Sequence, residues 1–145
     1  MKKRGDARVM VREDISAEDA YVPPWHFKQS ARVTEGTSMI FCNGLVGCQR
    51  DGTLAEPEPE PEAIAQADVA FGNMVKVATA AGDALADVVK TTVYIREDFR
   101  EHRDALGLTR SRYFTEHYPA PTLIQVAGFA NPDYLFQIEA MAVIN

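Results

Sequence analysis

The residues of this 145-residue chain with the clearest chemical potential lie near its C-terminus. Gln137 and Glu139 alternate with apolar residues in the segment 134–143, so both side chains fall on one face of a predicted strand. Glu139 is the only acid in that segment. A carboxylate on a half-buried strand must find a partner or raise its pKa. An ion pair or a backbone contact is its simpler role, and catalysis is the alternative.

A second group of residues could bind an anionic substrate. Arg110 and Arg112 lie on a predicted helix shortly before Pro121, and a guanidinium holds a carboxylate through two parallel hydrogen bonds. A solvated helix face is the simpler reading of both arginines. His26 lies in the proline-bounded aromatic segment 21–27, whose side chains either contact a ligand or close the edge of the core. Two further residues, Asn43 and Thr122, offer neutral hydrogen-bonding groups.

These side chains need a scaffold, and its clearest part spans residues 61–95. Apolar residues recur there at steps of three and four, which predicts a helix up to Gly82. The stripe consists of Ile64, Ala67, Phe71, Met74, Ala78 and Ala81. The segment 88–95 then alternates in the manner of a strand and is rich in β-branched residues.

The remaining segments complete an α+β pattern. Residues 8–12 are either an edge strand or a lead-in, and Asn43-Gly44 is a strong turn signal. The stretch 50–62, with its alternating Glu and Pro, predicts a solvated surface loop. We expect further strands at 31–33, 39–42, 45–47, 122–126 and 134–143, and a second helix at 104–117. Two helices would cover one face of the sheet.

Composition restricts the class of protein. The length suits one domain, with residues 1–20 as an N-terminal lead-in and 21–145 as the domain. A net charge of −6 argues against nucleic acid as a partner, and no apolar run is long enough for a membrane span. Residues 1–14 lack the apolar region of a signal peptide, so we expect a cytoplasmic location. Because the predicted strand 88–95 looks apolar on both faces, its uncovered face predicts a homo-oligomer.

Three separated stretches resemble the Rid family, also called YjgF/YER057c/UK114. They read ATAAGDALADVVKTTVYI, YFTEHYPAPTLIQVAG and FQIEAMAVI, and the resemblance covers roughly residues 24–144. It implies a chorismate-mutase-like α+β fold with a six-stranded mixed sheet packed on two helices. It also implies a homotrimer with a ligand cleft at each subunit interface. The archetypal members hydrolyse 2-iminopropanoate and 2-iminobutanoate to the 2-keto acid and ammonia without metal or cofactor.

The same resemblance exposes departures at the expected site. Pro121 stands where the family has its carboxylate-binding arginine, and Gln137 replaces the glutamate that positions water. Glutamine can orient water but cannot accept its proton. Phe27 lacks the hydroxyl expected at its position, and Asn43-Gly44 replaces a Ser-Gly pair. The expected site comprises Gln137 and Glu139 as catalytic residues, with His26, Phe27, Asn43, Gly44, Arg112, Pro121, Thr122 and Leu123 as substrate contacts.

Two functions fit this pattern. We favour a divergent Rid-type hydrolase or deaminase that acts on a small reactive imine or enamine, with no cofactor and no metal. The alternative is a non-catalytic trimeric protein that binds a small metabolite in the same cleft.

Overall fold

The computed structural model describes residues 11–15, 30–35, 38–81, 85–96 and 98–144. No helix in this described part of the chain is both long enough and apolar enough to cross a membrane. The described residues form six strands, two α-helices and one short 3₁₀ helix. In chain order they are β1 (Val11–Ile15), β2 (Ser30–Thr34), β3 (Ser38–Val46), α1 (Glu62–Ala80), η1 (Leu85–Asp87), β4 (Val88–Ile95), α2 (Phe99–Tyr113), β5 (Ala120–Gln125) and β6 (Phe136–Ile144).

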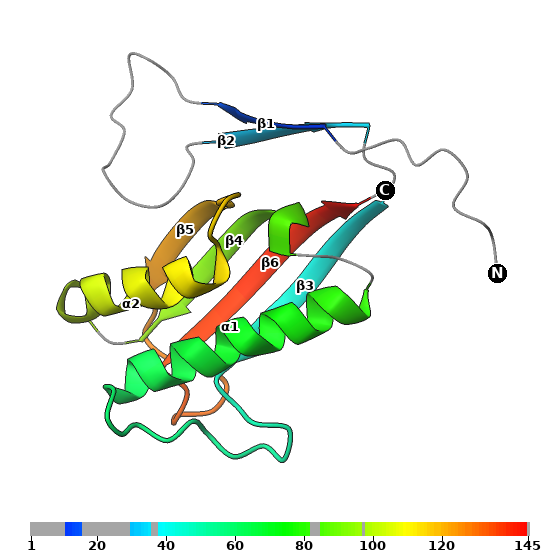
Figure 1. The fold of residues 1–145 in the computed structure, drawn as a ribbon. Helices are drawn as coiled ribbons and strands as arrows, with labels where there is room; N and C mark the ends of the chain where they lie inside the picture. Colours follow the sequence, from blue (N-terminus) through cyan, green and yellow to red (C-terminus); the bar gives the residue numbers. More distant parts are fainter. Residues whose placement is uncertain (1–10, 16–29, 36–37, 82–84, 97, 145) are drawn as a thin grey trace.

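The main sheet is mixed and has the strand order β3-β6-β4-β5. Strand β6 runs antiparallel to both β3 and β4, whereas β4 and β5 are parallel. Both α-helices lie on one face of this sheet (Figure 1). The α+β class, with two helices packed on a mixed sheet, is therefore confirmed.

The expected single six-stranded sheet is divided into two sheets in this structure. Strands β1 and β2 pair with each other as a separate two-stranded sheet, which lies near the ends of β4 and β5 (Figure 1). Arg12 of β1 donates to the carbonyl oxygen of Val88 at 3.2 Å and to that of Tyr118. In a single sheet, backbone hydrogen bonds would join β1 and β2 to the other strands. Here the Arg12 side chain hydrogen-bonds the two-stranded sheet to the main domain instead. The sequence allowed either an edge strand or a lead-in at residues 8–12, and the last two of these residues belong to β1.

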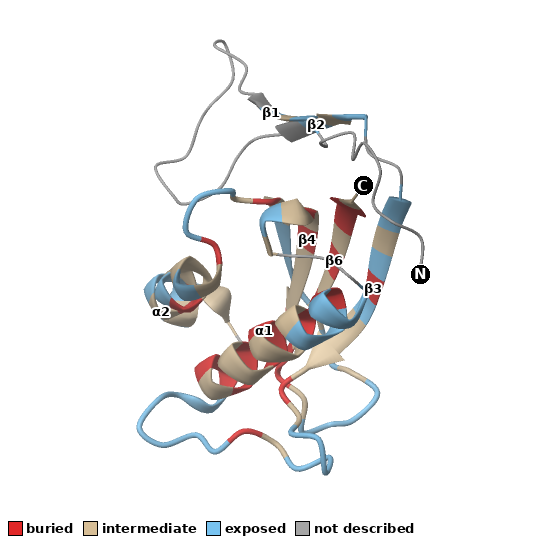
Figure 2. Ribbon diagram, turned by 45° about the vertical axis from the view of Figure 1, so that its right-hand side comes forward, coloured by how far each residue is buried: buried red, intermediate tan, exposed pale blue. Residues whose placement is uncertain are grey.

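The core lies between α1 and the helix-facing side of the sheet (Figure 2). Five of the six stripe residues of α1 are buried, and only Ala81, at the helix end, is exposed. On β6 the buried residues Phe136, Ile138, Ala140 and Ala142 form the predicted core face. Phe71 joins the layers, because its ring stacks on Tyr113 of α2 at 5.3 Å and lies 5.9 Å from Phe136.

Several element boundaries differ from the expectation. Asn43-Gly44 is not a turn: the residues continue through β3 as a bulge, where the register with β6 shifts between Cys42 and Leu45. Helix α2 begins at Phe99 rather than residue 104. Its start is fixed by Asp98, whose carboxylate accepts the N–H of Arg100 at 3.0 Å. Residues 99–103, which precede the predicted start, are thus helical, and Arg100, Glu101 and Arg103 among them are exposed.

Gln66 of α1 connects the helix to two other parts of the chain. Its buried side chain accepts the Leu135 N–H at 2.8 Å and donates to the Asp133 carbonyl at 3.0 Å. Gly47, just after β3, packs so closely that a Cβ there would lie 2.5 Å from the Gln66 Cα. Glycine at residue 47 is therefore required by close approach to α1.

Candidate functional site

The face of the main sheet opposite the helices, here called the open face, carries three of the predicted polar residues, Thr122, Gln137 and Glu139. The register pairs Thr92 with Glu139 and Tyr94 with Gln137 across β4 and β6. Paired residues of adjacent strands point to the same face. The polar side chains placed on the open face by this register are Lys90, Thr92, Tyr94, Thr122, Gln137 and Glu139.

Two hydrogen bonds connect these side chains across strands. The Tyr94 hydroxyl donates to Glu139 Oε1 at 2.9 Å, and Lys90 Nζ donates to Thr122 Oγ1 at 2.6 Å. The hydrogen bond to Glu139, with smaller effects of desolvation and the Glu139 charge, raises the pKa of Tyr94 above 10.0. The phenol therefore remains a donor to the carboxylate at neutral pH.

A hollow of about 180 Å³ lies over this cluster. It is lined by Phe41, Cys42, Lys90, Thr92, Glu139, Ala140 and Met141. An ammonium, a carboxylate and a hydroxyl therefore border one small space. Such a set can hold a small anionic molecule and place a proton acceptor beside it.

Gly44 and Gln137 are brought together at the bulge of β3. A Cβ built on Gly44 would lie 1.8 Å from Gln137 Nε2, so the amide occupies the space that a side chain at residue 44 would need. Neighbouring Asn43 is exposed. The structure thus places Gly44, Gln137, Glu139 and Thr122 on one side of the sheet.

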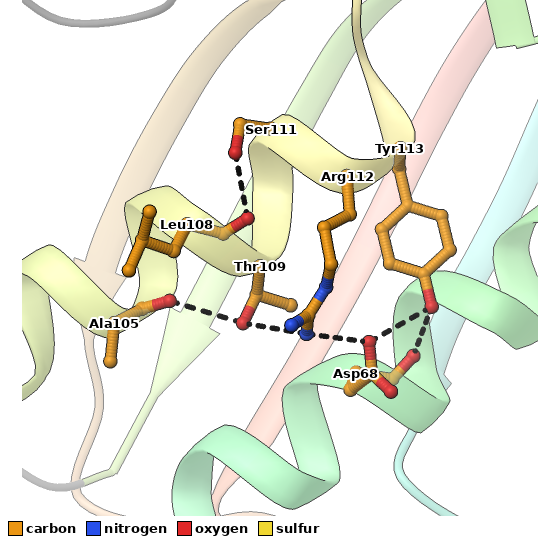
Figure 3. A network of polar contacts seen from close by, with 7 residues as sticks. All are labelled: Asp68, Ala105, Leu108, Thr109, Ser111, Arg112 and Tyr113. Atoms are coloured by element: carbon orange, nitrogen blue, oxygen red, sulfur yellow. Dashed lines mark hydrogen bonds and ion pairs between the residues drawn. The ribbon is translucent and has the colours of Figure 1, made fainter.

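Other predicted contacts lie elsewhere. Pro121 and Leu123 alternate with Thr122 and line a larger cavity beneath α2, on the helix side of the sheet. Arg112 lies between the helices, where Nη2 contacts Asp68 Oδ1 at 3.0 Å; the Tyr113 hydroxyl donates to the same carboxylate (Figure 3). The structure therefore does not bring Arg112 to the open face. His26 and Phe27 lie outside the described residues.

Sequence reasoning missed Lys90 and Tyr94 as functional candidates. Both belong to the predicted strand 88–95, whose alternation already placed Lys90, Thr92 and Tyr94 on one face. Only the pairing of β4 with β6 shows that these three side chains lie on the open face. Among the described residues, no group of three or more His, Cys, Asp or Glu side chains is arranged to hold a metal ion.

Curated relatives of this chain include named enzymes. It is 28% identical over 133 residues to RutC family protein YjgH of Escherichia coli K12, covering 92% of this chain and 89% of the relative. It is 32% identical over 112 residues to the 2-iminobutanoate/2-iminopropanoate deaminase of Salmonella typhimurium LT2, covering 73% of this chain and 80% of that enzyme.

The fold is shared with solved structures as well. A protein of unknown function of the conserved Rid protein family, YyfB from Yersinia pestis, matches with a TM-score of 0.80 at 25% identity. The match covers 92% of this chain and 98% of YyfB. The family model described as endoribonuclease L-PSP matches residues 21–144. The chain therefore belongs to the endoribonuclease L-PSP family, the Rid or YjgF/YER057c/UK114 family that its sequence resembles.

Proposed function

We propose that this protein hydrolyses a small reactive imine or enamine on the open face of its main sheet. The observation that carries the proposal is that Lys90 and Glu139 line one hollow of about 180 Å³, with Tyr94 hydrogen-bonded to the carboxylate. A hollow of this size suits a substrate of a few heavy atoms. A named imine deaminase among the relatives supports the reaction class.

The roles follow from the chemistry of each group. The Lys90 ammonium attracts the carboxylate of the substrate, a task that Pro121 cannot perform. Glu139 accepts a proton from a water molecule while the oxygen of that water bonds to the imine carbon. The hydrogen bond from Tyr94 fixes the orientation of the Glu139 carboxylate. Glu139 then passes the proton taken from water to the nitrogen, so the C=N bond becomes the C–N single bond of a neutral carbinolamine. Transfer of the hydroxyl proton to the nitrogen, again through Glu139, lets the C–N bond break, which forms C=O and releases ammonia with no oxidation or reduction.

Gln137 has a supporting part in this scheme. Its amide can donate to and accept from the attacking water but cannot remove the proton, so it orients the water only. Gly44 leaves the amide room on the open face, because any side chain there would overlap Gln137. The hydroxyl of Thr122, already bonded to Lys90, can share the substrate carboxylate.

We further propose that a homotrimer completes the site. Large apolar side chains are exposed on the open face: Met39 is 60% exposed, Phe41 68% and Ile124 41%. Their exposure beside the polar cluster favours cover by another copy of the chain. Sedimentation equilibrium tests this directly: three times the chain mass is expected, and a monomer at micromolar concentration would contradict an intersubunit site.

Turnover is tested with 2-aminoacrylate generated in situ, following release of keto acid and ammonia against a buffer control. Glu139→Gln should lower kcat by about 10²–10⁴-fold, the usual contribution of a general base. Lys90→Gln should raise KM by roughly tenfold or more, as expected for loss of a charged hydrogen bond. The exposed helix residues Glu101 and Lys76 provide matched controls as Glu101→Gln and Lys76→Gln. A Glu139→Gln enzyme with the wild-type rate would refute the assigned base.

The replacement of a family glutamate by Gln137 favours one second candidate, a binding protein without turnover. A binding protein of this kind should bind 2-oxobutanoate saturably, and Lys90→Gln should weaken that binding. It should release keto acid from 2-aminoacrylate no faster than buffer does. Rapid release that depends on Glu139 would exclude it.

A further inference from the structure

A cavity on the helix side of the main sheet is separate from the proposed imine site. It has a volume of about 540 Å³ and lies between α2 and strands β4 and β5. No residue that lines it also lines the hollow on the open face. This volume falls within the range usual for pockets that enclose a small organic molecule.

The walls of the cavity are mainly apolar from mouth to floor. Leu108 of α2 and Leu123 of β5 are 69% and 39% exposed, whereas Phe71 and Phe136 on the inner side are buried. An apolar molecule would therefore gain stabilising burial by passing between the two leucines toward the two rings. Exposed leucines of this kind also indicate a surface that a ligand can cover.

Arg110 gives this apolar space a charge. Its side chain lines the cavity, and its Nε atom is buried without a hydrogen-bond partner among the described residues. Burial lowers the pKa of Arg110, an effect that nearby Tyr118 opposes, but a guanidinium remains cationic at neutral pH. Arg103 and Asp104 also line the cavity, and their opposite charges offset each other. The net charge beside the apolar walls is therefore positive.

We infer that this cavity binds a small carboxylate with an apolar or aromatic body, with Arg110 holding the carboxylate. An unsatisfied buried donor is costly, so a ligand that supplies the acceptor regains that free energy. The apolar body would lie against Leu108 and Leu123 while the carboxylate meets the guanidinium. Arg112, two residues further along α2, is already paired with Asp68 and does not line the cavity. The inference does not depend on turnover at the open face.

The test uses 4-phenylbutyrate as the probe, with 4-phenylbutan-1-ol and acetate as comparison compounds. Binding to the full-length protein is followed by amide chemical shifts in ¹H–¹⁵N spectra, with Gly107 as a reporter inside the cavity. We expect 4-phenylbutyrate to bind at least about tenfold more tightly than the alcohol, and acetate to bind more weakly than either. Equal affinities for acid and alcohol would overturn the role of the charge, and absence of binding would overturn the site.

Three variants locate the interaction. Arg110→Gln should weaken 4-phenylbutyrate binding by about tenfold or more, whereas Arg112→Gln should change it by less than about twofold. Gly107→Leu should abolish binding without loss of folding, because a Cβ on Gly107 meets no atom within 4 Å and leucine favours a helix. Wild-type affinity in either Arg110→Gln or Gly107→Leu would overturn the assignment. Imine hydrolysis is measured separately, so failure of one site is distinguishable from failure of the other.

Discussion

Replacing Gly44 by alanine should destabilise the protein through one specific contact. The new Cβ would lie 1.8 Å from Gln137 Nε2, 2.6 Å from Cδ and 3.0 Å from Cγ. Three successive atoms are too close, so the amide must rotate away as a unit. The φ of Gly44 lies outside the left-handed region, and an alanine backbone is therefore acceptable there.

The magnitude follows from the nature of the obstacle. Forcing an extra methyl into a filled space costs about 1–3 kcal/mol, and we expect the lower half of this range because the Gln137 side chain can turn. In a Gln137→Ala background the obstacle is absent. Alanine at residue 44 should then be neutral or stabilising by up to about 1 kcal/mol, since glycine within a strand has an entropic cost. The coupling between the two positions should thus exceed about 1 kcal/mol.

Gly47 supplies an internal comparison. A Cβ there would meet the Gln66 Cα at 2.5 Å and the Gln66 carbonyl oxygen at 2.6 Å, which belong to the backbone of α1. Helix backbone cannot rotate away, so Gly47→Ala should cost about 3 kcal/mol or more. Gln66→Ala should not rescue it, because the obstructing backbone atoms remain.

Urea unfolding of the wild type, the Gly44→Ala and Gln137→Ala variants and the double variant measures the coupling, provided the slope with denaturant stays constant. Additive effects within about 0.5 kcal/mol would refute the contact. The Gly44→Ala variant should also hydrolyse imines more slowly, since its Gln137 amide has turned from the position in which it orients the water.

Three further predictions concern other parts of the chain. Asp98→Ala should lower Tm by about 2–4 °C at neutral pH by removing the cap of α2. Hydrogen bonding to Arg100 lowers the pKa of Asp98 from 3.8 to about 2, so thermal scans should show this wild-type advantage lost as pH falls between those values. Gly107→Ala should stabilise the protein by about 1 kcal/mol in urea unfolding, because its Cβ meets open space. In Glu139→Gln, ultraviolet titration should show the pKa of Tyr94 falling back toward 10.0; an unchanged value would exclude Glu139 as the cause.

Local pattern was sufficient for most of the scaffold. The stripe through Phe71 and Met74 predicted α1, and alternation predicted the buried face of β6 through Phe136 and Ile138. The turn predicted at Asn43-Gly44 was wrong because the same dipeptide suits both a turn and a bulge. It forms a bulge here because β3 pairs with β6 both before and after it. Such pairing is long-range and leaves no local signal.

The candidate site was predictable residue by residue but not as a group. Glu139 and Thr122 were singled out by type and place, yet their partners Tyr94 and Lys90 lie 45 and 32 residues earlier in the chain. The sequence also suggested that β4 is apolar on both faces, whereas its open face carries the polar side chains of Lys90, Thr92 and Tyr94. No local pattern indicates that Arg112 is paired, because its partner, Asp68, lies 44 residues earlier in the chain.

The buried amide of Gln66 has a consequence for the order in which parts of the protein open. The Leu135 N–H, just before β6, is bonded to this side chain rather than to a neighbouring strand. Its hydrogen-exchange rate therefore reports whether α1 is docked, even though the amide lies beside the sheet. Undocking of α1 would release Asp133 and Leu135 together and remove the close neighbour of Gly47. The first helix, the turn before the last strand and the end of β3 thus constitute one cooperative unit.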